Sequence, residues 1–324
     1  MPITRRHLLG ASLGPLGLLA PPARAEAWPA RPLSLISPYG AGGSNDILTR
    51  LLAEALAARL GQNVVVENKA GAGTRIANEF VARAAPDGYT VLHAAAPIAI
   101  GEALYPKLPY DARKSFEPVT RTAIAPLFLV VNASAPYKTV AEFVAYAKSN
   151  PKGLTFGSPG AGSAPHLTAE LLLRAAGVQG VVVQYRGDAP AYNELLAGRI
   201  DGTLTALSTA LPHVQAGKLR VLAVANEDRT PLQPQTPTFR EAGLAGVVGY
   251  GWYGLMVPAG TPAAVVQRLA SETQAVLARP DIRQKAEALG LQLRGSTGPE
   301  FAAFIDSETR KWAQIIKAAN ITPE

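Results

Sequence analysis

The stretch LSLISPYGAGGSNDILTRLLAEALAARL, residues 33–60, decides the fold prediction. Leu33–Ser37 is an apolar run of strand length, and a glycine-rich segment follows it. Within 46–60 the apolar residues recur three to four positions apart, as on one face of a helix. Gly61 stands where glycine typically ends a helix. A strand, a glycine-rich loop and a helix in this order are typical of α/β proteins.

The same unit recurs along the chain. We expect strands over residues 33–37, 64–67, 89–93, 154–157, 181–185, 200–207, 219–225 and 252–257. We expect helices over 46–60, from the second strand to about 85, over 139–149, 164–176, 189–197 and 262–277, and from about 299 onward. Thr139 with Glu142 and Thr297 with Glu300 form capping boxes, and Thr261 is expected to cap its helix. This alternation predicts an α/β fold of mostly parallel sheets flanked by helices.

Two stretches break the alternation and indicate crossings between two lobes. Residues 116–132 form a long apolar passage without helical spacing, and residues 226–240 contain three prolines. If the chain crosses at both places, the first lobe comprises residues 27–125 plus 232–324. The second lobe then comprises residues 126–231.

The first 25 residues have the three parts of a secretory signal. Arg5 and Arg6 precede a weakly apolar stretch, and the segment ends with the small residues Ala23 and Ala25. The paired arginines favour twin-arginine export, with Sec export as the alternative. A membrane anchor is a further alternative, although the apolar stretch is shorter than the roughly 20 residues of a spanning helix. We expect cleavage near Ala25 and a mature protein outside the cytoplasm.

The net charge is less informative once this leader is removed. The chain carries 31 Lys and Arg against 24 Asp and Glu, a formal charge of +7. Removing the leader's three arginines gives 7 − 3 = +4. The basic residues are scattered and only 6% of residues are aromatic, which argues against a nucleic-acid partner. The chain has no cysteine, which excludes disulfides and thiolate chemistry.

Four strand-to-helix turns, at 38–46, 71–74, 157–163 and 186–188, are rich in small residues. Such turns lie at the carboxyl ends of parallel strands, where ligands bind. Glycine lets the backbone approach a ligand, and the next helix presents unpaired N–H groups at its positive end. The turns therefore predict binding of a carboxylate or another small anion. The plain alternative is that they are tight turns with ordinary helix caps, such as Ser163.

Catalytic, cofactor and metal motifs are absent from the sequence. No turn ends in Gly-Lys-Ser/Thr, and residues 71–76 lack the third glycine of the dinucleotide motif. No histidine pair has metal-ligand spacing. We expect no catalytic residue, no cofactor and no metal. The enzymatic alternative is a periplasmic hydrolase that uses Ser163 or Ser158 with His166.

Several short segments, taken together and in order, resemble one known family. They are Trp28-Pro29, residues 38–46, VVVENKAGAG at 64–73, APDGYT at 85–90, LPYD at 108–111, residues 157–166, LPH at 211–213 and residues 254–262. The chain resembles the substrate-binding receptors of tripartite tricarboxylate transporters, often called Bug receptors, over essentially its whole mature length.

The resemblance implies a monomeric, two-lobed periplasmic binding protein, type II-like, with its ligand cleft between the lobes. It would capture a small mono- or dicarboxylate, aromatic ones included, for membrane permease subunits. The alternative is a sensor that presents the ligand to a signalling system. We expect ligand contacts from Tyr39, Ala41, Gly42, Gly43, Ser44, Asp46, Ser158, Gly160, Ala161, Gly162, Ser163, His166, Arg186 and Thr205. We also expect Tyr39 and Trp252 to wall the cleft.

The sequence departs from the family pattern in the predicted site. Thr205-Ala206 stands where many relatives have Asp-Asn, and the loss of that carboxylate would admit a more negative ligand. Ala94–Ala96 replaces polar residues, which would favour an apolar ligand body. Arg75 and Arg186 are the candidate charged clamps.

Overall fold

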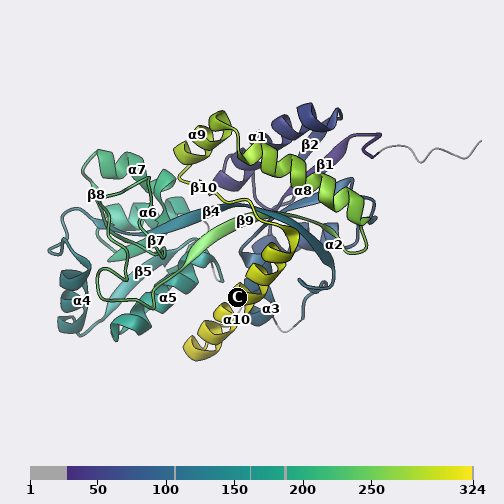
Figure 1. Cartoon of the computed structure of the whole chain (residues 1–324). Coiled ribbons are helices and arrows are strands. Elements are labelled where there is room, and N and C mark those ends of the chain that lie inside the picture. The colour runs from purple at the N-terminus through teal and green to yellow at the C-terminus, as the bar shows by residue number, and fades with distance from the viewer. Residues whose placement is uncertain (1–27, 106, 161, 186–187, 323–324) are drawn as a thin grey trace, which may run out of the picture.

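One long strand, β4 (Phe116–Asn132), runs through both halves of the molecule (Figure 1). The computed structural model describes residues 28–105, 107–160, 162–185 and 188–322, so the predicted signal segment lies outside the described residues. The first part of β4 pairs with β9 (Tyr250–Pro258) and β10 (Gln292–Leu293). Its last part pairs with β7 (Gly202–Ala206) and β8 (Leu219–Val224). The predicted non-helical passage at 116–132 is thus a strand that both lobes share.

The sheet of the first lobe is parallel at one edge and antiparallel at the crossing. β2 (Val64–Asn68), β1 (Leu33–Ser37) and β3 (Thr90–Ala95) run parallel, and β9 joins β3 antiparallel. The helices are α1 (Ser44–Leu60), α2 (Arg75–Ala82), α3 (Pro97–Leu104), α8 (Ala263–Leu277), α9 (Pro280–Ala288) and α10 (Gly298–Ala319), with a 3₁₀ turn, η1, at Ala72–Thr74.

The second lobe repeats this plan with fewer elements. β5 (Leu154–Ser158) runs parallel to both β6 (Gly180–Gln184) and β7. The helices are α4 (Val140–Ser149), α5 (Ala164–Ala176), α6 (Asp188–Leu196) and α7 (Leu207–Gln215). Two lobes of strands flanked by helices confirm the predicted two-lobed α/β fold class. The sheets are mixed rather than mostly parallel, because β4 pairs antiparallel with β7, β8, β9 and β10.

Each lobe packs a core on both faces of its sheet. In the first lobe, Leu35 packs with α1 and α8, whereas its neighbour Ile36 packs with α3 and α10. In the second lobe, the neighbours Leu129 and Phe128 likewise pack into two different core clusters. Successive strand residues point to opposite faces, so the uninterrupted apolar runs of the sequence correspond to strands covered on both sides.

The chain's return to the first lobe lies beside the first crossing, where β4 leaves that lobe. The Ala225 amide donates to Leu127 O, and the Gly249 amide donates to Ala225 O, both at 2.8 Å. Between these bonds, Phe239 and Val247 pack in the same core cluster as Leu127. The lobe boundaries stay a prediction, and this packing favours a return near Gly249 rather than at residue 232.

Helix ends follow the predicted pattern in most places. Both capping boxes are present, and Gly61 is left-handed with φ 68° at the end of α1. The predicted cap at Thr261 is wrong: the hydroxyl of Thr261 donates to Pro258 O, and Pro262 occupies the cap position. α3, α7, α9 and β10 were not predicted. Within the described ranges, no helix combines the length and apolar character needed to cross a membrane.

Candidate functional site

The first predicted turn, residues 38–46, is shorter in the structure because α1 begins at Ser44. The remaining loop, residues 38–43, is held by the carboxylate of Asp46. One oxygen of Asp46 accepts the Gly42 amide at 2.9 Å and Arg50 Nε at 3.1 Å. The other accepts Arg50 Nη2 at 3.0 Å and Asn68 Nδ2 at 2.7 Å. Asn68 Nδ2 also donates to Tyr39 O at 2.9 Å, so it joins the start of the loop to the start of α1. Asp46 therefore shapes the loop from inside.

The charge of Asp46 is neutralised locally. Burial acts to raise the pKa of the Asp46 carboxyl, but the hydrogen bonds from Arg50, Asn68 and the Gly42 amide hold this pKa below its ordinary value. The side chain of Asp46 is 2% exposed, whereas that of Arg50 is 51% exposed. The carboxylate stays ionised at neutral pH and faces the protein.

The start of α1 has no side-chain cap. Gly43 is the N-cap residue, and the first amide bonded within the helix is that of Ile47, which donates to Gly43 O at 3.0 Å. The amides of Ser44, Asn45 and Asp46 consequently have no intrahelical acceptor. Gly42 and Gly43 are exposed beside them. Backbone N–H groups at a helix N-terminus form a suitable site for a carboxylate.

A series of hydrogen-bonded, buried polar side chains supports the start of α1. Asn45 Oδ1 accepts the Ser37 hydroxyl at 2.9 Å, and Thr49 Oγ1 donates to Asn45 O at 2.6 Å. Thr49 Oγ1 lies 2.6 Å from His93 Nδ1, and His93 Nε2 lies 2.9 Å from Thr122 Oγ1. Burial lowers the pKa of His93 to about 3, so its imidazole is neutral. This series links the first ligand loop to β3 and to the shared strand β4.

Sequence reasoning missed this network because its members come from four separate elements. His93 has no metal-ligand spacing with another histidine, so the sequence predicts no role for it. Its position in a strand gives no sign of the two hydroxyls that flank it, since both are far away in the sequence.

The second predicted turn, residues 157–163, is closed by the polar groups of its described residues. The Gly160 amide donates to Ser158 Oγ at 3.3 Å, and the Gly162 amide donates to His166 Nδ1 at 3.0 Å. Ser163 is the N-cap of α5 and accepts the His166 amide at 3.3 Å. Its own amide donates to Gly160 O at 3.2 Å. Several of the backbone donors predicted for a ligand are thus used within the loop.

His166 is a neutral acceptor at the base of this loop. Its residue surface is 6% exposed, and burial lowers its pKa to about 4. Because Nδ1 accepts the Gly162 amide, the ring proton resides on Nε2, which lies 3.8 Å from Glu170 Oε1. Burial raises the pKa of Glu170, and the nearby charge of Arg174 opposes this. His166 stabilises the loop in its neutral form.

The second loop contacts the first lobe. A Cβ atom on Gly162 would lie 2.3 Å from Leu104 Cδ2, so the second loop directly contacts α3 of the first lobe. α3 follows β3, which is paired to β1, and the first loop follows β1. The glycine at 162 has φ +70° and leaves no room for a side chain at this contact.

The remaining predicted site residues divide into three groups. Thr205 is buried, and its hydroxyl lies 2.5 Å from the Tyr192 hydroxyl and 3.2 Å from Thr209 Oγ1. Ala161 and Arg186 lie outside the described residues. Arg75 donates to Ala72 O at 2.8 Å and stacks at 4.0 Å on the ring of Tyr105. The roles of all these residues as ligand contacts stay predictions.

The expectation that Trp252 walls the cleft is wrong. Its residue surface is 0% exposed, and its ring packs at 5.5 Å against Phe301 and at 5.6 Å against Phe304 of α10. Alternation along β9 directs this side chain into the core. Tyr39, the other expected wall residue, is partly exposed at the mouth of the first loop.

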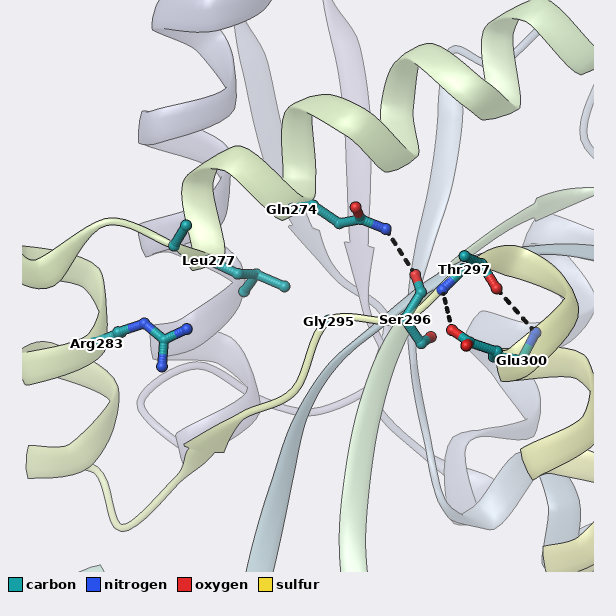
Figure 2. A pocket seen from close by; sticks show the side chains of 8 residues that line it. Gln274, Leu277, Arg283, Gly295, Ser296, Thr297 and Glu300 are labelled. Carbon is teal, nitrogen blue, oxygen red and sulfur yellow. Dashed lines mark hydrogen bonds between the residues drawn. The ribbon is translucent and has the colours of Figure 1, made fainter.

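Two cavities lie away from the predicted loops. One, of about 330 Å³, lies between α8, α9 and the start of α10 (Figure 2). There Gln274 Nε2 donates to Ser296 O at 2.9 Å, and Thr297 and Glu300 are bonded to each other in their capping box. These polar groups are committed to one another. The second cavity, of about 310 Å³, lies over the crossing strands. Among the described residues, no group of three metal-ligating side chains is found.

The molecule has two lobes joined by crossing strands, and small-residue turns lie at the carboxyl ends of its parallel strands. This is the architecture of a solute-binding protein. The model of the tripartite tricarboxylate transporter family receptor, TctC, matches residues 48–321, and the chain belongs to this family. The family is periplasmic, and its members are solute-binding receptors.

Relatives and solved structures agree with this assignment over nearly the whole chain. Protein BugT of Bordetella pertussis is 32% identical over 312 residues, which cover 96% of this chain and 95% of BugT. The R. palustris protein Rpa4515, solved with adipate, is 33% identical with a TM-score of 0.82 and covers 92% of this chain and 100% of its own. MatC from Rhodopseudomonas palustris, solved with bound malate, is 32% identical with a TM-score of 0.77, over 89% of this chain and 100% of its own.

Proposed function

We propose that this protein is an extracytoplasmic receptor that captures a small mono- or dicarboxylate for a tripartite tricarboxylate-type transporter. The observation that carries the proposal is the uncapped start of α1 beside the exposed Gly42 and Gly43. Its amides bind one carboxylate group, and the loop at 159–163 closes over the ligand from the other lobe. Adipate and malate in two solved relatives support a dicarboxylate.

The lobes move as two bodies in this proposal. The first comprises residues 27–125 and the C-terminal part of the chain, and the second the residues between the crossings. Closure pivots where β4 leaves one sheet for the other and where the chain returns near Gly249. The chain acts as a monomer, and its partners are the permease subunits in the membrane.

The hydrolase alternative lacks a nucleophile and base pair. His166 Nδ1 is occupied by the Gly162 amide, and Ser163 Oγ accepts the His166 amide. A general base needs a free lone pair within hydrogen-bonding distance of the serine hydroxyl. We therefore assign Ser163 and His166 to loop structure and propose that the protein is not an enzyme.

The test is a thermal-shift panel on the mature protein with adipate, malate and benzoate, and with glucose and ethylamine as controls. A ligand at 100 times its dissociation constant adds about 2.7 kcal/mol to the free energy of unfolding. This raises the melting temperature by several degrees in a protein of this size. A shift with glucose or ethylamine, and none with any carboxylate, would overturn the proposal. Ligand-dependent uptake in cells that contain the permease then separates a transport receptor from a sensor.

A further inference from the structure

The second cavity lies over the hinge and is separate from the predicted ligand loops. Its volume is about 310 Å³, within the range of roughly 300–1,000 Å³ that small-molecule sites occupy. It is lined by Arg121 and Ile124 of β4, Tyr250 of β9, Gln292 and Arg294 at β10, and the segment 226–229. Gln292 Nε2 donates to Thr230 Oγ1 at 2.7 Å, which ties this segment to β10.

Two arginines, Arg121 and Arg294, line the hinge cavity. Within the described part of the chain, neither arginine forms an ion pair. Arg121 Nε is buried and has no hydrogen-bond partner, while the guanidinium stacks at 4.6 Å on Phe304. Burial lowers the pKa of Arg121, and the positive charge of Arg294 acts in the same direction.

Two carboxylates of α10, Glu300 and Glu308, interact electrostatically with Arg121, but both are already bonded to other groups. Glu300 accepts the Thr297 amide at 2.8 Å in its capping box. Glu308 pairs with Lys311 and accepts Trp312 Nε1 at 3.0 Å. Neither neutralises the arginine pair, so an anion placed between the two guanidinium groups would be stabilised.

The segment 226–229 adds acceptors to the lining of the hinge cavity. Asn226 is 6% exposed, and its Oδ1 atom is buried without a partner in the described residues. The carboxylate of the next residue, Glu227, makes no ion pair there either, whereas Asp228 pairs with Arg240 and Arg229 with Glu241. A buried amide oxygen without a donor costs about 1–3 kcal/mol, which a bound N–H group would recover.

We propose that the hinge cavity binds a small amphoteric molecule, an α-amino acid, at a site distinct from the cleft. Its carboxylate lies between Arg121 and Arg294, and its ammonium group donates to Asn226 Oδ1 and Glu227. The two arginines and the two acceptors call for opposite charges on one small ligand. A simple anion satisfies the arginines only, and a simple amine satisfies Asn226 and Glu227 only.

The test is isothermal titration of the mature protein with L-alanine, propionate and ethylamine. Each of the last two lacks one charged group of L-alanine. We expect L-alanine to bind with at least about tenfold higher affinity than either fragment, the effect of one charge-assisted hydrogen bond. Arg294→Gln and Glu227→Gln should each weaken L-alanine binding by a similar factor. Arg310→Gln, an exposed arginine of α10, is the matched control and should leave binding unchanged.

A loop variant separates this site from the cleft. Gly42→Ala alters the first ligand loop, so L-alanine binding that survives Gly42→Ala and falls in Arg294→Gln supports the hinge site. The reverse pattern places L-alanine in the cleft and overturns the proposal. Equal affinity for propionate and L-alanine, or no L-alanine binding at millimolar concentration, overturns it as well.

Discussion

The loop at residues 38–43 and the loop at residues 159–163 both follow a parallel strand and precede a helix, yet they are organised by different chemistry. The first is braced by a charged carboxylate, Asp46, while the amides of its helix remain uncapped. The second is braced by a neutral imidazole, which accepts the Gly162 amide, and by a serine cap, which accepts the His166 amide at the start of α5. The same small-residue pattern in the sequence therefore gives one loop that is open to an anion and one that is largely self-satisfied.

This difference assigns unequal tasks to the lobes in the proposed receptor. The first lobe supplies unpaired donors for a carboxylate, and the second supplies a closed loop that contacts α3. Variants that damage the first loop should reduce ligand affinity most. Variants in the second should act mainly through stability and closure.

The largest effect is expected for Asp46→Ala. It leaves the Gly42 amide, Arg50 and Asn68 without their shared acceptor, so the free energy of unfolding should fall by about 3 kcal/mol. Carboxylate affinity should fall about tenfold or more because the loop loses its shape. Urea unfolding and calorimetric titration measure the two effects. Glu54→Ala, on the exposed face of the same helix, should change stability by no more than about 0.5 kcal/mol. Unaltered affinity in Asp46→Ala would remove the first loop from the proposed site.

Gly162→Ala and Gly42→Ala form a matched pair for the two loops. Both glycines have positive φ, +70° and +90°, so each substitution strains the backbone by about 1 kcal/mol. At 162 the added Cβ also meets buried Leu104 at 2.3 Å, whereas at 42 nothing lies within 4 Å. The cost at 162 should rise to about 2–3 kcal/mol. Equal unfolding midpoints for the two variants would show that the contact between loop and α3 is absent in solution.

His166 should make the stability of the second loop depend on pH. In the unfolded chain its imidazole gains a proton as pH falls through its ordinary pKa of 6.5, but the folded site resists protonation until about pH 4. Folded stability should thus decrease by about 2 kcal/mol from this group as the pH falls from about 7 to 5. His166→Gln should reduce the slope of this part of the profile by about half, because buried His93 contributes a comparable loss over the same pH range. His213→Gln is the control for removal of one imidazole. A wild-type slope in His166→Gln would contradict the buried, neutral assignment.

The smallest effect is expected for Ser163→Ala, which removes the cap of α5. Loss of a serine cap costs about 1 kcal/mol. Thr139→Ala removes the comparable cap of α4, away from the cleft, and should cost a similar amount. Only Ser163→Ala should also alter ligand affinity, by about threefold or less. An equal loss of affinity in both variants would mean that the effect comes from global destabilisation.

The sequence predicted elements wherever a pattern was long and regular. α1, α5 and α10 show helical spacing over many residues, and their caps are local signals. α3 could not be predicted because its sequence, PIAIGEAL, is short, apolar and interrupted by Gly101. α7 could not be predicted because its first residue continues the apolar run of β7 and because Pro212 lies inside the helix. Short segments whose burial depends on distant partners carry no sufficient local pattern.

The site was predictable at the level of loops and not at the level of contacts. Small residues after a strand identified both loops, and Asp46 with Arg50 has the spacing of a helical ion pair. Asn68 and His93 joined the site only through folding, because strand pairing brings them to it. Trp252 was misassigned because an apolar run covered on both faces does not reveal which way each side chain points.

The position of β9 has a consequence for synthesis of the chain. β9 lies between β3 and β4 in the first lobe, although about 120 residues separate it from β4 in the sequence. A ribosome therefore releases β1, β2, β3 and β4 long before the strand that joins them. Until residue 258 emerges, β3 and β4 each present an unpaired edge, which favours pairing with other chains. The N-terminal half of this receptor should depend on chaperones during translation more than its middle lobe, whose strands β5, β6 and β7 follow one another closely.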